Sequence, residues 1–129
     1  MADQEDVRRI ALALPQTMEA DGDFVFSVVD AKGKPHGFAW AWNERVHPKQ
    51  ARVPRADVLA VRVIDEEDKQ ALLASDPETF FTEPHYDGFP AVLVRLPQID
   101  VDELAELIED AWRTRASRAL LEAYERGGA

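Results

Sequence analysis

The sequence predicts an α+β fold: a two-layer sandwich in which a mainly antiparallel sheet of about four to five strands carries helices packed on one face. Three observations support this class. Segments rich in β-branched and aromatic residues occupy the middle of the chain, a turn-forming stretch joins two of them, and amphipathic helical segments lie near both ends. The 129 residues are enough for one hydrophobic core, so we expect a single domain over residues 1–129.

The chain opens with a helix predicted over residues 4–14. Asp3 precedes this helix as an N-cap, Asp6 follows three residues later, and Pro15 prevents the helix from continuing. The apolar residues of the segment recur at helical spacing, at Val7, Ile10, Ala11 and Leu14.

Two strands joined by a turn follow. Residues 24–29 are rich in β-branched and aromatic side chains, and residues 30–35 contain the Asp, Gly and Pro typical of a turn. In residues 37–42 large aromatic residues alternate with alanines, as in a strand whose two faces differ. This alternation predicts that Phe38, Trp40 and Trp42 share one face of the sheet.

The central part of the chain predicts two further strands with a helix between them. Residues 43–57 contain two prolines and no consistent period, which indicates a loop or a short irregular strand. Residues 58–64 and 91–96 are apolar runs typical of strands. Asp65 is expected to cap a helix that reaches about residue 74. The residues expected to face the core from this helix are Ala71, Leu72 and Leu73.

Turns and helices complete the chain. The Asp-Pro pair at 76–77 predicts a short helical turn that ends at the two phenylalanines 80–81, and residues 83–90 are rich in turn formers. Asp100, with Glu103 as a capping-box partner, is expected to begin the longest helix, and Ser117 a last one. The apolar stripe of the longest helix consists of Val101, Leu104, Ala105, Ile108, Ala111 and Trp112.

Composition excludes several kinds of site. The chain has no cysteine, which rules out disulfides, thiolate metal sites and cysteine nucleophiles. Its three histidines are far apart in sequence, and its carboxylates have the pattern of helix starts and solvated faces. No phosphate-binding glycine loop or nucleophile elbow occurs. We therefore expect no catalytic residues, no metal, no cofactor and no enzymatic activity.

Two features of the sequence bear on localisation. No apolar run approaches the roughly 18 residues of a membrane span. The first six residues are acidic, whereas a signal peptide begins with basic and then apolar residues. These features predict a cytoplasmic protein without a membrane partner.

Charge is distributed unevenly along the chain. The formal net charge is −10, which disfavours wholesale wrapping by nucleic acid. Between residues 32 and 55, however, six basic residues stand against one acid, Glu44, so this stretch carries +5 and the remainder −15. A basic hairpin and loop can contact phosphates, although the same side chains could instead pair with the acidic remainder. The six basic residues are Lys32, Lys34, Arg45, Lys49, Arg52 and Arg55.

Aromatic residues offer two further candidate sites. Trp40 and Trp42 are two residues apart on one strand, so they could form a stacking platform for bases or simply pack in the core. His85 and Tyr86 could line a cleft, or their segment could be a tight turn into the last strand. We keep all four residues as candidates for ligand binding.

Five segments occur in a characteristic order over nearly the whole chain. They are IALALP at 10–15, ERVHPK at 44–49, ASDPETFF at 74–81, PHYDG at 84–88 and a terminal helix with AWR at 111–113. Together these segments resemble the MmcQ/YjbR family of small bacterial proteins.

That resemblance implies a compact α+β domain similar to the frataxin-like two-layer arrangement. It also implies the label that this family carries, a DNA-binding protein similar to a "double wing" domain of a phage transcription factor. The residues that the resemblance assigns to a DNA-contacting wing are Arg45, His47, Lys49, Arg52 and Arg55. The family supplies no catalytic residues to transfer.

Two functions from different classes follow. The first is a DNA-binding or regulatory module that contacts the phosphates of double-stranded DNA through the basic hairpin and loop, with Trp40 or Trp42 contacting bases. The second is a domain that binds a small anionic ligand or a protein in a cleft between the sheet and the turn at His85 and Tyr86. Neither hypothesis involves catalysis.

Overall fold

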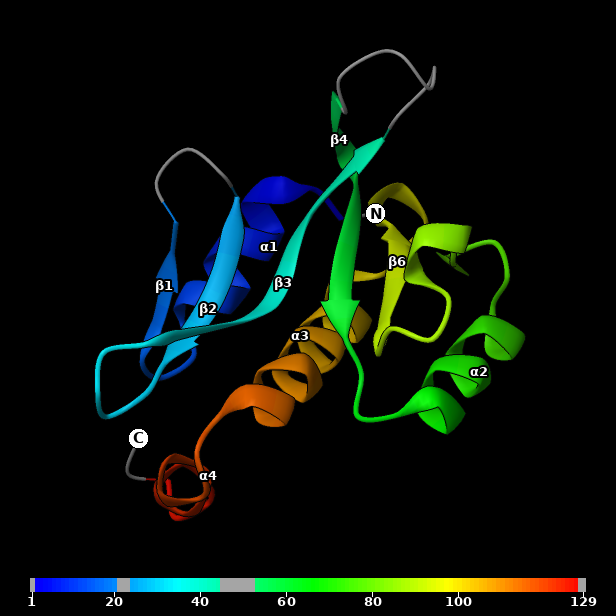
Figure 1. The fold of residues 1–129 in the computed structure, drawn as a ribbon. Helices are drawn as coiled ribbons and strands as arrows, with labels where there is room; N and C mark the ends of the chain where they lie inside the picture. The colour runs from blue at the N-terminus through cyan, green and yellow to red at the C-terminus, as the bar shows by residue number, and fades with distance from the viewer. Residues whose placement is uncertain (1, 21–23, 45–52, 128–129) are drawn as a thin grey trace.

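A six-stranded antiparallel sheet forms the centre of the structure, a computed structural model that describes residues 2–20, 24–44 and 53–127 (Figure 1). The strands lie in the order β1-β2-β3-β4-β6-β5, and every neighbouring pair is antiparallel. The strands are β1 (Thr17–Glu19), β2 (Val25–Val29), β3 (Pro35–Glu44), β4 (Val53–Arg62), β5 (Phe80–Phe81) and β6 (Ala91–Arg95).

Four of these strands confirm the predicted ones, and the two additional strands, β1 and β5, lie at the edges of the sheet. The predicted short helical turn forms, because the carbonyl oxygen of Asp76 accepts from the backbone amides of Thr79 at 3.1 Å and Phe80 at 2.9 Å. The two phenylalanines that end it, Phe80 and Phe81, pair with β6 as a short strand. Strands of two or three residues are too short to show a periodicity, so only their pairing with a longer neighbour reveals them.

The central hairpin is longer than the sequence predicts. Residues 43–57 were expected to form a loop or a short irregular strand, but Glu44 of β3 pairs with Val53 of β4. A register shift after Ala41 accommodates the irregular sequence of this part of β4. The remaining residues of the connection, 45–52, lie outside the described residues.

Helices cover one face of the sheet, as predicted. α1 (Gln4–Leu12) and α3 (Val101–Arg115) pack against each other, and α3 also packs on β2, β3 and β4. α2 (Glu66–Ser75) contacts β5 and β6 at one edge of the sheet, while α4 (Arg118–Glu125) packs on α3 through Tyr124. Two short 3-10 helices, η1 (Pro84–Tyr86) and η2 (Leu96–Gln98), flank β6.

Three of the four predicted caps form. The side chains of Asp3 and Asp6 make a reciprocal capping box at α1, and Asp65 and Ser117 accept hydrogen bonds from backbone amides of α2 and α4. Asp100 occupies the N-cap of α3, but its side chain makes no capping bond, so the expected pair with Glu103 is absent. Asp102 and Glu103 in the first turn of α3 still interact favourably with the positive end of the helix dipole.

The hydrophobic core lies between the sheet and the helical layer. Trp112 of α3 is fully buried, and its indole Nε1 donates to the carbonyl oxygen of Pro15 at 3.0 Å. The predicted stripe of α3 supplies much of this core, with Leu107 in addition. Other fully buried side chains are Val7, Phe26, Phe38, Leu59, Val61, Leu96 and Ile99.

The prediction that Phe38 shares a face with Trp40 and Trp42 is wrong, because a β-bulge interrupts the alternation in β3. Phe26 pairs with Ala39 and Ser27 with Gly37, so Phe38 is an extra residue in β3. Consecutive residues of a bulge can face the same side. Phe38 therefore packs in the helix-side core beside Ala39, whereas Trp40 and Trp42 lie on the opposite face.

The buried face of α2 also differs from the prediction. Ala71 is exposed and Leu72 and Leu73 are only partly buried, whereas the side chain of Lys69 is 1% exposed. Lysine counts as solvent-facing in a hydrophobicity pattern, so the pattern alone could not indicate this face. The carbonyl oxygens that accept hydrogen bonds from Lys69 belong to Tyr86 and Phe89. Tyr86 packs on the sheet face opposite α1 and α3.

Candidate functional site

The sheet face opposite α1 and α3 carries a second, smaller apolar cluster, which we call the aromatic face. Its fully or partly buried members come from the four strands β3, β4, β5 and β6 and from the segment 84–90, which packs on them. They are Trp40, Trp42, Val58, Ala60, Phe81, Tyr86 and Leu93. The sequence analysis named Trp40, Trp42 and Tyr86 as site residues, and the fold brings these three together.

Rings on the aromatic face contact one another edge to face. The centroids of Trp40 and Phe89 are 6.2 Å apart, and those of Trp42 and Phe81 are 5.8 Å apart with an interplanar angle of 81°. Tyr86 lies 5.9 Å from Phe89. Such arrangements pair the positive edge of one ring with the negative face of the next, which fixes the orientation of each ring.

Hydrogen bonds hold the segment 84–90 against the sheet. The indole Nε1 of Trp40 donates to the hydroxyl of Tyr86 at 3.2 Å. From α2, the Nζ of Lys69 donates to the carbonyl oxygens of Tyr86 at 2.6 Å and Phe89 at 3.1 Å. The segment is therefore anchored from both sides, with Tyr86 directed onto the sheet; the side chain of His85 lies outside the described part of the structure.

Two arginines lie over rings of the aromatic face. The guanidinium of Arg62 is 5.3 Å from the centroid of Phe89, and that of Arg95 is 4.1 Å from the centroid of Phe81. Neither arginine takes part in an ion pair among the described residues. Burial and the positive charge of Arg115 lower the pKa of Arg62. Both guanidinium groups thus keep an unneutralised charge beside aromatic surface.

A cleft of about 360 Å³ opens on the aromatic face beside Trp42, and we call it the Trp42 cleft. The indole Nε1 of Trp42 is buried and has no hydrogen-bond acceptor among the described residues. This volume falls within the roughly 300–1,000 Å³ range of pockets that hold small molecules. The residues that line it include Trp42, Asp57, Val58, Phe81, Arg95 and Gln98.

The described members of the predicted DNA-contacting basic stretch lie at two ends of the sheet. Lys32 and Lys34 are exposed at the β2–β3 turn, and Arg55 lies near the start of β4 at the opposite end (Figure 1). β3, which separates the two ends, spans ten residues, or about 30 Å. The other predicted phosphate-contacting residues, Arg45, His47, Lys49 and Arg52, lie outside the described residues.

A histidine and an arginine lie close to the β2–β3 turn. The Nε2 of His36 is 2.9 Å from a carboxylate oxygen of Asp30, and its Nδ1 is 3.4 Å from a guanidinium nitrogen of Arg115. The hydrogen bond from His36 and backbone amides of the turn lower the pKa of Asp30. The carboxylate of Asp30 is thus held within the turn and leaves Lys32 and Lys34 directed to solvent.

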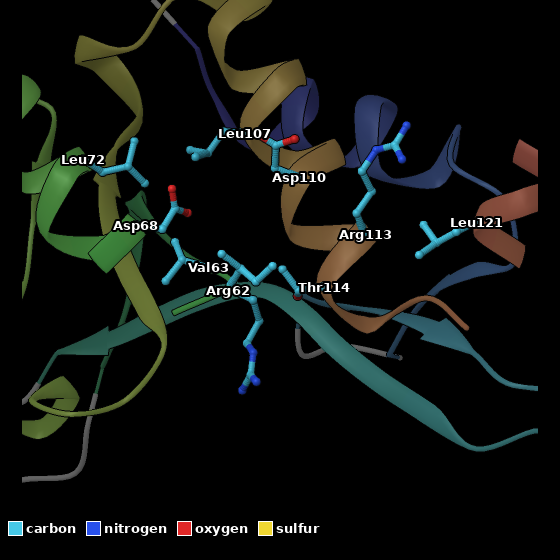
Figure 2. Close-up of a pocket in the computed structure, with 10 residues that line it drawn as sticks. Arg62, Val63, Asp68, Leu72, Leu107, Asp110, Arg113, Thr114 and Leu121 are labelled. Atoms are coloured by element: carbon cyan, nitrogen blue, oxygen red, sulfur yellow. The ribbon is translucent and has the colours of Figure 1, made fainter. Parts of the chain in front are cut away.

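A larger cleft, of about 470 Å³, lies between α2 and α3, and we call it the α2–α3 cleft (Figure 2). Asp68 and Asp110 face it from the two helices, while the side chain of Arg62 points away from it, below the sheet. Burial and the neighbouring carboxylates, Asp68 among them, raise the pKa of Asp110. Its apolar lining includes Val63, Ile64, Leu72, Leu107 and Leu121.

The predicted cleft beneath His85 and Tyr86 is not among these two. Tyr86 lines neither the Trp42 cleft nor the α2–α3 cleft, because its ring packs on Trp40 and Phe89.

The described residues bring no group of three histidine, aspartate or glutamate side chains together as metal ligands. Among the described helices, none has the length and apolar character that spanning a membrane requires.

Sequence reasoning missed several residues of the aromatic face. Arg62 and Arg95 each end an apolar strand, in VLAVR and AVLVR. A charged residue at the end of such a strand is the sequence feature that could have indicated them as site residues. The sequence predicts Phe81 only as the end of a helical turn and does not indicate that it pairs with β6. Lys69 gave no signal, because its partners are backbone carbonyls 17 and 20 residues away in the chain.

Comparison with known proteins gives relatives over the whole chain. Proteins of Mycobacterium tuberculosis and Mycobacterium bovis, named uncharacterized proteins Rv2570 and Mb2600, are 38% identical to this chain over 137 residues. Each alignment covers 96% of this chain and 96% of the relative.

A solved structure shares the fold. The crystal structure of Deinococcus radiodurans protein DR2400, with the family domain DUF419, matches with a TM-score of 0.66 at 20% sequence identity. The match covers 98% of this chain and 89% of that protein. The model of the YjbR family itself matches residues 12–114. The chain therefore belongs to the YjbR family, the MmcQ/YjbR family that its sequence segments resemble.

Proposed function

We propose that this protein is a DNA-binding regulatory module, without catalytic activity, that meets double-stranded DNA with the aromatic face and the two ends of the sheet. The observation that carries the proposal is the pair of arginines, Arg62 and Arg95, that lie over Phe89 and Phe81 without a carboxylate partner among the described residues. In a chain with 25 acids and 15 lysines and arginines, carboxylate partners are abundant. Cations beside aromatic rings are a common chemistry of nucleic-acid binding.

The separation of the basic residues also favours a duplex. The ends of the sheet are about 30 Å apart along β3. One turn of B-DNA is about 34 Å, so a duplex along this strand would offer phosphates to both ends at once. One end would contribute Lys32 and Lys34. The other would contribute Arg55. Arg45, His47, Lys49 and Arg52, which the sequence places between β3 and β4 and which lie outside the described residues, are proposed to add further contacts.

Titration of a fluorescently labelled duplex at several salt concentrations tests the proposal. With about four phosphate contacts, the logarithm of the affinity should fall with the logarithm of salt at a slope of about −3 to −4. Charge reversal at Lys32 and Lys34, or at Arg45, Lys49 and Arg52, should each weaken binding and make the slope less steep by about one unit per lost contact.

Arg9 provides the matched control, because it lies on α1 in the helical layer and pairs with Asp6 at 3.2 Å. R9E changes the net charge as much as one reversal in the basic groups, but should change binding far less. Absence of duplex binding at about 50 mM salt and tens of micromolar protein would refute the proposal. So would equal losses for R9E and for a single reversal at Lys32 or Arg45.

The α2–α3 cleft favours a second candidate, a small-ligand domain. The carboxylates of Asp68 and Asp110 face this cleft and make no ion pair among the described residues, while its walls are mostly apolar. This chemistry suits an aliphatic amine rather than the anionic ligand expected from the sequence. A melting-temperature increase with an aliphatic amine such as hexylamine, lost in D110N, would support it; no increase would exclude it.

A further inference from the structure

The walls of the Trp42 cleft suit a flat, apolar ligand. Trp42 and Phe81, whose rings meet at 81°, both line the cleft. Val58 adds an aliphatic contact from β4, and the Cζ of Arg95 lies 4.1 Å from the Phe81 centroid. Flat ligands stack on surfaces of this kind, and they lose little conformational entropy on binding.

The polar groups of the cleft include donors and acceptors together. Trp42 presents a buried Nε1 donor without an acceptor among the described residues. Gln98 carries both an amide donor and a carbonyl acceptor. The edge of a nucleobase presents donors and acceptors side by side, so it can pair with both groups of this side chain.

We propose that the Trp42 cleft accommodates one unpaired nucleobase of the bound DNA, stacked on the indole of Trp42 and meeting the Phe81 ring edge to face. This inference rests on the proposed function and names the part of DNA that the aromatic face recognises. Bases within a duplex are stacked and present only their edges. Therefore the cleft selects DNA in which a base is unpaired or extruded, a state that costs least at a mismatch or bulge.

Trp40 supplies the matched control for Trp42. Both indoles lie on the aromatic face of β3 and both are partly buried. The Nε1 of Trp40 is already bonded to Tyr86, and its ring packs on Phe89, so it has no role in the cleft. The two residues thus differ in the feature that the proposal requires, a ring that lines a cavity.

Three labelled duplexes of one sequence and length test the inference at fixed salt: a fully paired duplex, a duplex with a one-nucleotide bulge, and a duplex with an abasic site at the same bulge. The bulged backbone is the same in the last two, so their difference reports the base alone. We expect the base-containing bulge to bind about tenfold more tightly than the abasic bulge, the effect of one stacked base. The W42A and Q98A variants should reduce this ratio toward one.

W40F should keep the ratio, and W42F, which preserves a ring, should retain part of it even if W42A folds poorly. Equal affinity of the wild-type protein for the base-containing and abasic bulges would overturn the inference. An equal loss of the ratio in W40F and W42F would overturn it as well. In either case, duplex binding with a salt slope of about −3 to −4 would leave the proposed function intact. Absence of binding to all three duplexes would refute both.

Discussion

The two faces of the sheet treat the same residue types differently, and the three tryptophans and the arginines show how. Trp112, on the helix side, is fully buried and donates to Pro15, while Trp42, on the aromatic face, lines a cleft with its Nε1 unsatisfied. Arginines of the helical layer form ion pairs with carboxylates, at Arg8, Arg9, Arg113 and Arg118.

On the aromatic face, in contrast, Arg62 and Arg95 lie over rings without an ion pair among the described residues. Arg8 and Arg113 of the helical layer also lie over rings, but each is paired with a carboxylate. Buried polar groups are normally satisfied by hydrogen bonds, so the helix side has the properties of a folding core. The guanidinium of Arg95 donates to the carbonyl oxygens of Pro77 and Glu78 but has no carboxylate partner among the described residues. The helix side therefore carries most of the stability, and the aromatic face is the better candidate for binding.

The largest expected effect separates two tryptophans. W112A should lower the free energy of unfolding by about 3–5 kcal/mol, because it leaves a large cavity in the core. W42A should cost about 1 kcal/mol, since Trp42 is only partly buried and its N–H has no bond to lose. Urea denaturation of both variants measures the difference, and similar costs would contradict the division of roles between the two faces.

Lys69 allows the aromatic face to be loosened separately. K69M keeps much of the aliphatic stem but leaves the carbonyl oxygens of Tyr86 and Phe89 without their donor, so it should cost about 2 kcal/mol. Tryptophan emission should shift to longer wavelength as the segment over Trp40 loosens. K34M, at an exposed lysine, is the control and should change neither quantity. An unchanged emission in K69M would show that the lysine does not hold this segment.

A smaller effect tests the ion pairs of the helical layer through pH. Two hydrogen bonds from Arg8, at 2.8 and 3.0 Å, lower the pKa of Glu19. A lowered pKa in the folded state stabilises the protein above the ordinary pKa of 4.5, and this contribution is lost as the pH falls through the lowered value.

E19Q should therefore cost about 0.5–1 kcal/mol at pH 7, the size of a well-formed surface pair, and almost nothing at pH 2. Chemical denaturation at the two pH values measures this. An equal cost at both would mean that Glu19 acts through packing rather than charge.

The smallest effect concerns the α2–α3 cleft and has the opposite sign. Burial and like charges raise the pKa of Asp110, so ionisation of this carboxyl destabilises the folded state once the pH exceeds its ordinary pKa of 3.8. D110N should slightly raise the melting temperature at pH 7 and leave it unchanged at pH 3, where the carboxyl is protonated. A lower melting temperature at pH 7 would indicate an ion pair that the described structure lacks.

The sequence by itself determined the class of the fold and most of its elements. Asp3, Asp65 and Ser117 mark the starts of three helices, and the apolar stripe around Trp112 identifies the face that α3 buries. These features could be predicted because caps and periodicity act between residues a few positions apart. The resemblance of its segments also indicated the family.

Only the tertiary structure decided the composition of the candidate site. The bulge at Phe38 places this residue on the helix side, while Trp40 and Trp42 lie on the aromatic face. Phe81 reaches the same face through a two-residue strand. Lys69 is buried against carbonyl oxygens 17 and 20 residues away in the chain. Each of these depends on contacts between distant segments, whose energies do not appear in local propensity. The charge pattern likewise placed Lys32 and Arg55 in one stretch, but the length of β3 separates them because a strand is extended.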